Sequence, residues 1–100
     1  MPVYHIVLFH LKPEVTDDQI SEWSQMVKSQ LGQVPGLISI EANKPLPVAV
    51  PRTKGYDMAV VAVLEGAEHV EGYTRYAAQS QAQSFREALF DDTIAFDLEF

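Results

Sequence analysis

The first strand of the chain decides its fold, and it reads VYHIVLFHL from Val3 to Leu11. β-branched, aromatic and aliphatic side chains dominate this stretch and Pro13 follows it closely, a pattern typical of a β-strand. Alternate residues of a strand point to opposite faces. Here both faces are apolar, with Val3, Val7, Phe9 and Leu11 on one and Tyr4, Ile6 and Leu8 on the other. A strand with one face exposed to solvent would alternate between apolar and polar residues, so we expect both faces of this strand to be covered.

An amphipathic helix follows this strand. The residues Thr16-Asp17-Asp18-Gln19 form a capping-box pattern, with acidic side chains placed favourably for the helix dipole. Apolar residues then recur at spacings of three and four, at Ile20, Trp23, Val27, Leu31 and Val34. We expect the helix to end at Gly32 or at the Pro35-Gly36 pair.

Prolines, glycines and hydrophobic periodicity divide the rest of the chain. The expected elements are strands at Leu37–Ala42, Tyr56–Leu64 and Thr93–Phe100 and helices at about Ala67–Ala77 and Gln79–Phe90. The segment from Asn43 to Gly55 contains three prolines, so we expect neither a helix nor a central strand there. We expect Asp91 and Asp92 to end the last helix.

This order, β-α-β-β-α(α)-β, predicts an α+β fold of the ferredoxin-like type with a four-stranded antiparallel sheet. Helices cover one face of such a sheet, yet the first, third and fourth strands are apolar on the other face too. A second copy of the chain would cover that face, so we expect a twofold homodimer through the sheets. The side chains expected in this interface are Tyr4, Ile6, Leu8, Ile94, Phe96, Leu98 and Phe100.

The helix-facing side of the last strand carries small or polar side chains. These are Thr93, Ala95 and Asp97, which we expect to lie opposite Trp23 and Tyr73. Small residues facing large ones predict a cavity between the sheet and the helices.

Composition narrows the classes of partner. The chain has 100 residues, which predicts one domain over residues 1–100, with a net charge of −7 and no cysteine. Its acidity repels phosphate groups, so we expect neither nucleic acid nor a membrane as partner. The longest apolar stretch, Met58–Leu64, is too short to cross a bilayer, and no secretory signal is visible, so we expect a cytoplasmic protein.

Motifs for metals and cofactors are missing from the sequence. The three histidines show no metal-ligand spacing, and no glycine-rich nucleotide loop is present. We therefore expect neither a metal nor a cofactor. We expect His10 at the rim of the dimer and His69 in a solvated position.

His5 and Tyr73 are the candidates for acid–base chemistry. His5 is either a core histidine or a general base or hydrogen-bond donor at the floor of the cavity. Tyr73 is either an aromatic anchor of its helix or a phenol that donates to a carbonyl or enolate oxygen. Arg52 and Lys54 lie in the proline-rich segment, where they either are solvated or hold a ligand carboxylate.

The whole chain resembles the stress-responsive dimeric α/β-barrel (Dabb) family. The matching motifs are HIVLFHLK at His5–Lys12, VPGLISI at Val34–Ile40, GYD at Gly55–Asp57, E-x-x-x-x-Y ending at Tyr73 and AFD at Ala95–Asp97. The resemblance implies a homodimer in which two sheets close into a barrel. It also implies a relation to cofactor-free polyketide cyclases similar to olivetolic acid cyclase.

In those cyclases, the resemblance places His5 and Tyr73 on pocket residues and Phe9, Trp23 and Val27 on the cavity lining. Gln79 and Met58 stand where the catalytic relatives carry histidine. Glutamine takes up no proton at neutral pH, so the mechanism does not transfer unchanged.

Three functions are compatible with these residues. The first is a cofactor-free cyclase, aldolase or lyase for a polyketide-like or other oxygen-rich small molecule, with His5 and Tyr73 catalytic. The second is a stress-response or hydrophobic-ligand-binding dimer without catalysis, and the third is a structural module. The expected substrate-binding residues are Val7, Phe9, Trp23, Val27, Met58, Val60, Gln79 and Phe85, although residues such as Trp23 and Met58 more often belong to a core than to a ligand platform.

Overall fold

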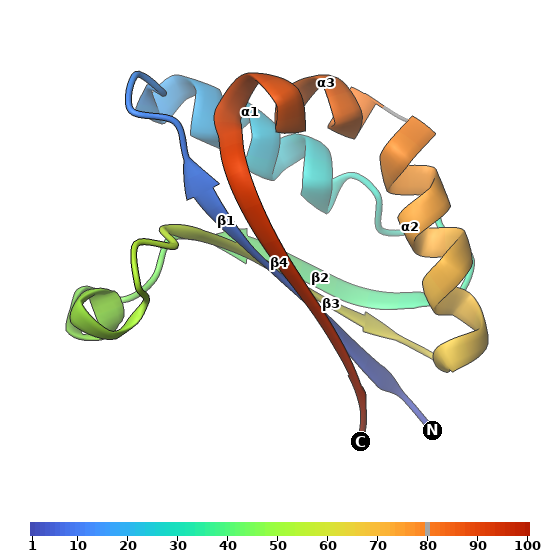
Figure 1. Ribbon diagram of the computed structural model, residues 1–100. Helices are drawn as coiled ribbons and strands as arrows, with labels where there is room; N and C mark the ends of the chain where they lie inside the picture. Colours follow the sequence, from blue (N-terminus) through green and yellow to red (C-terminus); the bar gives the residue numbers. More distant parts are fainter. Residues whose placement is uncertain (80) are drawn as a thin grey trace.

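The computed structural model describes residues 1–79 and 81–100, with Gln79 described through its backbone alone (Figure 1). Its elements are β1 (Val3–Leu11), α1 (Asp17–Lys28), β2 (Leu37–Asn43), the 3₁₀ helix η1 (Pro47–Arg52), β3 (Met58–Leu64), the 3₁₀ turn η2 (Ala67–His69), α2 (Val70–Gln79), α3 (Gln81–Leu89) and β4 (Phe90–Glu99). This order confirms the predicted ferredoxin-like α+β fold.

The sheet has the strand order β2-β3-β1-β4, with every neighbouring pair antiparallel. The three α-helices lie together on one face of it (Figure 1). The side chains of β1 alternate as the sequence predicts: Val3, His5, Val7 and Phe9 are buried toward the helices. The core therefore lies between the sheet and the helix layer.

The opposite face of the sheet is apolar and open. Tyr4, Ile6 and Leu8 of β1 lie directly across from Leu98, Phe96 and Ile94 of β4, so these six side chains share this face. Phe96 is 60% exposed, and the Tyr4 and Phe100 rings stack with centroids 3.9 Å apart. In the described part of the chain no helix covers this face (Figure 1).

Several element boundaries differ from the sequence predictions. Helix α1 ends at Lys28, before the predicted glycine, because the chain closes into tight turns from Ser29 onward. Asp91 and Asp92 do not simply end a helix: β4 already begins at Phe90, since Leu11 pairs with Phe90 and a bulge accommodates Asp91. The proline-rich segment contains η1, a short 3₁₀ helix that projects from the body (Figure 1), so the expectation of no helix there was wrong.

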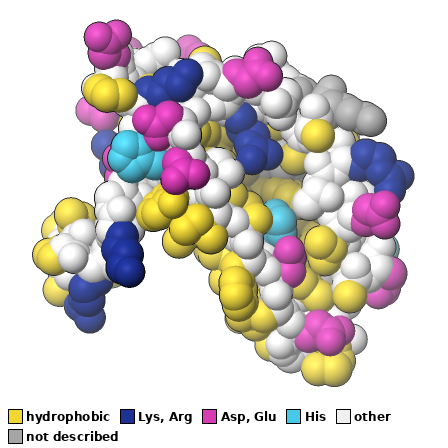
Figure 2. Space-filling view, viewed as in Figure 1, with side chains coloured by type: hydrophobic (Ala, Val, Ile, Leu, Met, Phe, Trp, Pro, Cys, Tyr) yellow, Lys and Arg dark blue, Asp and Glu magenta, His cyan; other side chains and the backbone are white. Residues whose placement is uncertain are grey.

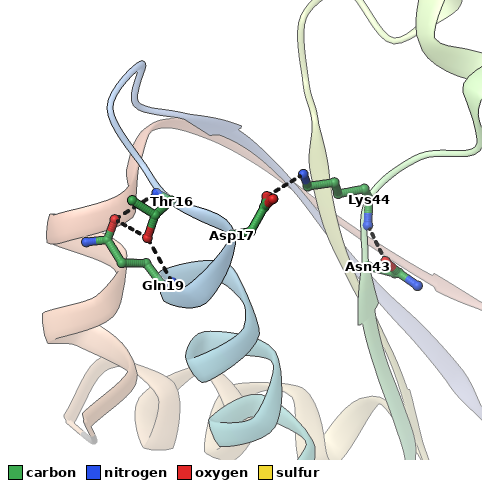
Figure 3. Close-up of polar contacts among 5 residues, drawn as sticks. All are labelled: Thr16, Asp17, Gln19, Asn43 and Lys44. Carbon is green, nitrogen blue, oxygen red and sulfur yellow. Dashed lines mark hydrogen bonds and ion pairs between the residues drawn. The ribbon is translucent and has the colours of Figure 1, made fainter.

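The predicted capping box begins α1, as Figure 3 shows. The Thr16 hydroxyl accepts from the Gln19 backbone N–H at 3.2 Å, and the Gln19 side-chain oxygen accepts from the Thr16 backbone N–H at 2.8 Å. Next to it, Lys44 Nζ lies 3.3 Å from Asp17 Oδ1, which joins the start of α1 to the end of β2.

Replacing Thr16 with alanine is expected to lower the free energy of unfolding by about 1 kcal/mol, because the Gln19 backbone N–H loses the hydroxyl that accepts its hydrogen bond. Urea denaturation followed by circular dichroism measures the change. Ser21→Ala, an exposed position on the same helix, is the control and should not destabilise the protein, because alanine is the better helix former. Equal stability of Thr16→Ala and the wild type would contradict the role of the cap.

Candidate active site between the sheet and the helices

A pocket of about 120 Å³ opens between the sheet and the three helices. Its apolar lining consists of Val7, Phe9, Trp23, Val27, Val60 and the small residues Ala77, Ala82 and Ala95. Its polar lining consists of His5, Gln30, Tyr73, Thr74 and Arg86. Figure 2 shows a hollow with hydrophobic side chains at its floor and a basic side chain and a histidine on its rim. Ala95 borders it together with Trp23 and Tyr73, as expected for a cavity formed opposite small residues.

His5 lies in the middle of β1 and is 4% exposed. Its Nδ1 is 2.5 Å from Asp97 Oδ1, because Asp97 is the residue directly opposite His5 on β4. An ionised carboxylate only accepts hydrogen bonds, so Nδ1 carries the hydrogen and a neutral imidazole keeps its lone pair on Nε2. The Asp97 side chain is 38% exposed and so lies on the solvent side of the pair.

Tyr73 extends from α2 to the same wall. Its ring centroid is 5.0 Å from that of His5, in an edge-to-face arrangement, and its hydroxyl donates to Gln30 Oε1 at 3.4 Å. Burial raises the pKa of Tyr73 to about 12, although the nearby Arg86 charge lowers it. The phenol therefore keeps its proton at neutral pH and acts as a hydrogen-bond donor rather than a base.

Four polar residues of this site were not predicted as functional residues from the sequence: Gln30, Thr74, Arg86 and Asp97. The sequence predicts Asp97 on the helix-facing side of its strand but does not reveal it as the partner of His5. Gln30 lies three residues after Val27, and Arg86 lies four residues after Ala82, so each shares a helix-spacing pattern with a pocket residue. A search for polar residues at those spacings would have found both.

The sequence profile of the stress responsive A/B barrel domain, Dabb, matches residues 3–100. The chain belongs to the Dabb family. Two solved structures, both described as dimeric ferredoxin-like proteins of unknown function, resemble this Dabb protein across its full length. The one from Thermobifida fusca is 25% identical with a TM-score of 0.81, over 100% of this chain and 92% of that one. The one from Jannaschia sp. CCS1 is 16% identical with a TM-score of 0.82, over all of both chains.

A third similar structure has a named activity, the hydroxynitrile lyase from Passiflora edulis. It is 18% identical with a TM-score of 0.68, over 97% of this chain and 91% of that one. At this identity the likeness shows a shared fold. Comparison with curated proteins finds no match.

Two of the predicted substrate-binding residues that the structure describes, Met58 and Phe85, do not line this pocket. Met58 is 2% exposed and belongs to the core, where it pairs with Phe9 across the strands. Phe85 packs against the core at the edge of the helix layer. Both side chains contribute to the core packing, and the side chain of Gln79 lies outside the described residues. The expected residues Val7, Phe9, Trp23, Val27 and Val60 do line the pocket.

The other two histidines lie away from this pocket. His10 Nδ1 is 2.5 Å from Asp91 Oδ1, and this hydrogen bond is the main cause that raises the pKa of His10. His69, expected in a solvated position, is only 28% exposed, because its ring packs against Gly36. Among the described residues no group of three histidine or acidic side chains is arranged to hold a metal ion. No described helix is long and apolar enough to cross a membrane.

Proposed function

We propose that this Dabb protein is a small-molecule-binding homodimer whose pocket performs cofactor-free acid–base chemistry on a carbonyl compound, as a cyclase, aldolase or lyase. The observation that carries the proposal is that His5, held by Asp97, lines the pocket in edge-to-face contact with the Tyr73 ring. A base held by a carboxylate next to a neutral phenol is an arrangement suited to forming an enolate.

The proposed reaction begins at Nε2 of His5. This nitrogen takes a proton from the carbon next to a substrate carbonyl, and the Asp97 carboxylate stabilises the imidazolium that forms. The Tyr73 hydroxyl donates a hydrogen bond to the enolate oxygen. The enolate carbon then attacks a second carbonyl of the same molecule, and His5 returns the proton to the new alkoxide. The apolar residues around the site hold the carbon chain of the substrate in a folded conformation and exclude water.

The open sheet face supports the homodimer in this proposal. A monomer would expose a contiguous apolar surface on β1 and β4, and the similar proteins from Thermobifida fusca and Jannaschia are described as dimeric. In a ferredoxin-like fold a second sheet closing over this face would produce the α/β barrel.

Gln79 favours a second candidate function, ligand binding without turnover. The resemblance to the catalytic relatives places their basic histidine at this position, and glutamine accepts no proton at neutral pH. In this alternative the pocket is the same, and His5 and Tyr73 orient a ligand through hydrogen bonds.

Filling the pocket tests whether it is the functional site. Ala95→Leu is expected to lower binding and turnover at least about 10-fold, because the larger side chain occupies space that Ala95 leaves open to the ligand. Suitable probes are a linear poly-β-keto thioester, assayed for cyclisation, and mandelonitrile, assayed for release of cyanide. NMR titration measures binding of the same probes.

Ala88→Leu, on the exposed surface of α3, is the matched control and should behave as the wild type. Turnover that is lost in Ala95→Leu supports the enzyme. Binding at pocket residues without turnover supports the ligand-binding alternative. If Ala95→Leu binds and turns over the probes as well as the wild type, the pocket is not the site.

A further inference from the structure

Arg86 lines the pocket and has no acidic partner among the residues that the structure describes. Its guanidinium carbon is 5.8 Å from the centre of the Phe9 ring, and Phe9 is part of the pocket lining. Arg86 and Tyr73 both line this pocket, and the charge of Arg86 lowers the pKa of Tyr73 against the effect of burial. The cation therefore faces the space in which the proposed chemistry takes place.

Four described cations, Lys12, Arg52, Lys54 and Arg86, form no ion pair with a described carboxylate, and of these four only Arg86 lines this pocket. The chain has fourteen acidic and seven basic residues, yet no described carboxylate lies within ion-pair distance of Arg86. By comparison, Arg75 on the exposed side of α2 is 3.2 Å from Glu71. The contact with the Phe9 ring holds the guanidinium without neutralising its charge, and it leaves the N–H donors available.

We propose that Arg86 binds the carboxylate of the ligand, so that the pocket selects small organic acids, in particular oxo acids. A guanidinium pairs with a planar carboxylate through two parallel hydrogen bonds. With the carboxylate at Arg86, a carbonyl elsewhere in the same molecule reaches toward Tyr73 and His5. This inference rests on the proposed function, because it names the class of ligand for that pocket.

Acid and amide pairs test this selectivity, because the two members have nearly the same shape and differ in charge. The probes are 4-oxopentanoate with 4-oxopentanamide and benzoate with benzamide, titrated at pH 7 and followed by NMR. We expect the wild type to bind each acid at least about 10-fold more tightly than its amide, as for a charge-assisted pair. Arg86→Gln should bring the two affinities within about threefold.

Two further variants separate a specific contact from a general effect of charge. Arg86→Lys keeps the charge but loses the planar pair of donors, so it should retain part of the preference. Arg75→Gln removes the same charge from the outer surface of a neighbouring helix and should leave the preference unchanged.

The possible results distinguish this inference from the function on which it rests. Equal binding of acid and amide to the wild type, or an unchanged preference in Arg86→Gln, overturns the role of Arg86 and leaves the pocket intact. If neither pair shifts the signals of pocket residues in the wild type, both the small-molecule pocket and its selectivity are contradicted.

Discussion

Phe96→Asp is expected to convert the protein from a dimer to a monomer, with the dimer dissociation constant raised at least about 1,000-fold. Phe96 is the most exposed of the apolar residues on the open sheet face, and a twofold interface would contain it twice. Burying a phenylalanine contributes about 1.5–3 kcal/mol. In each of the two chains, the substitution removes that contribution and places an unpaired carboxylate in an apolar contact, which costs several kcal/mol more.

Sedimentation equilibrium at micromolar concentration measures this change. The wild type should have twice the 11.2 kDa mass of one chain, and Phe96→Asp should have the mass of a single chain. Leu31→Asp introduces the same charge at a residue that is 50% exposed in the turn after α1, and should leave the dimer intact. A wild type that sediments as a monomer, or a Phe96→Asp variant that remains dimeric, would contradict the proposed interface.

Replacing His5 with glutamine is expected to lower turnover by about 10²–10⁴-fold, the usual contribution of a positioned acid–base group. Glutamine has a similar reach and still forms hydrogen bonds, but it takes up no proton. Ligand affinity should therefore change little while turnover falls. Asp97→Asn should also lower turnover. An amide carries no negative charge to stabilise the imidazolium, and because it can donate as well as accept, it no longer keeps the hydrogen of the imidazole on Nδ1.

Steady-state kinetics on the probe that the wild type turns over measure these losses. Circular dichroism checks that each variant is folded, so that a loss of turnover is not caused by unfolding. Tyr73→Phe is the comparison within the site. Its hydroxyl is a donor and not a base, so we expect a loss of about 10²-fold whose size does not depend on pH near neutrality. His10→Gln, at the far end of β1, should retain full turnover. Full turnover of His5→Gln would contradict the assignment of the base.

The pocket combines features that are rarely selected for stability alone. A histidine–carboxylate pair, a buried phenol and an arginine that pairs with no described carboxylate surround a space that the core leaves open. Each of these groups loses hydration on burial, and the sheet would pack more densely with apolar side chains in their place. This arrangement supports a binding or catalytic role more strongly than a purely structural one.

Local patterns in the sequence were sufficient for the element order and for the two faces of the sheet. The alternation of the side chains in Val3–Leu11 between the two faces of the sheet is predictable without knowledge of the neighbouring strands. Successive side chains of any strand point to opposite faces. The capping box at Thr16 was predictable for the same reason, since its two hydrogen bonds join residues three positions apart.

Strand register and helix packing decided the site itself. His5 and Asp97 are 92 residues apart in the sequence and meet because β1 and β4 pair in one register; a shift by one residue would turn Asp97 to the other face. Arg86 comes over Phe9 through the packing of α3 on the sheet. The sequence by itself thus determined which faces are apolar, because that depends on residue spacing. The tertiary structure alone decided which polar groups meet, because that depends on contacts between distant segments.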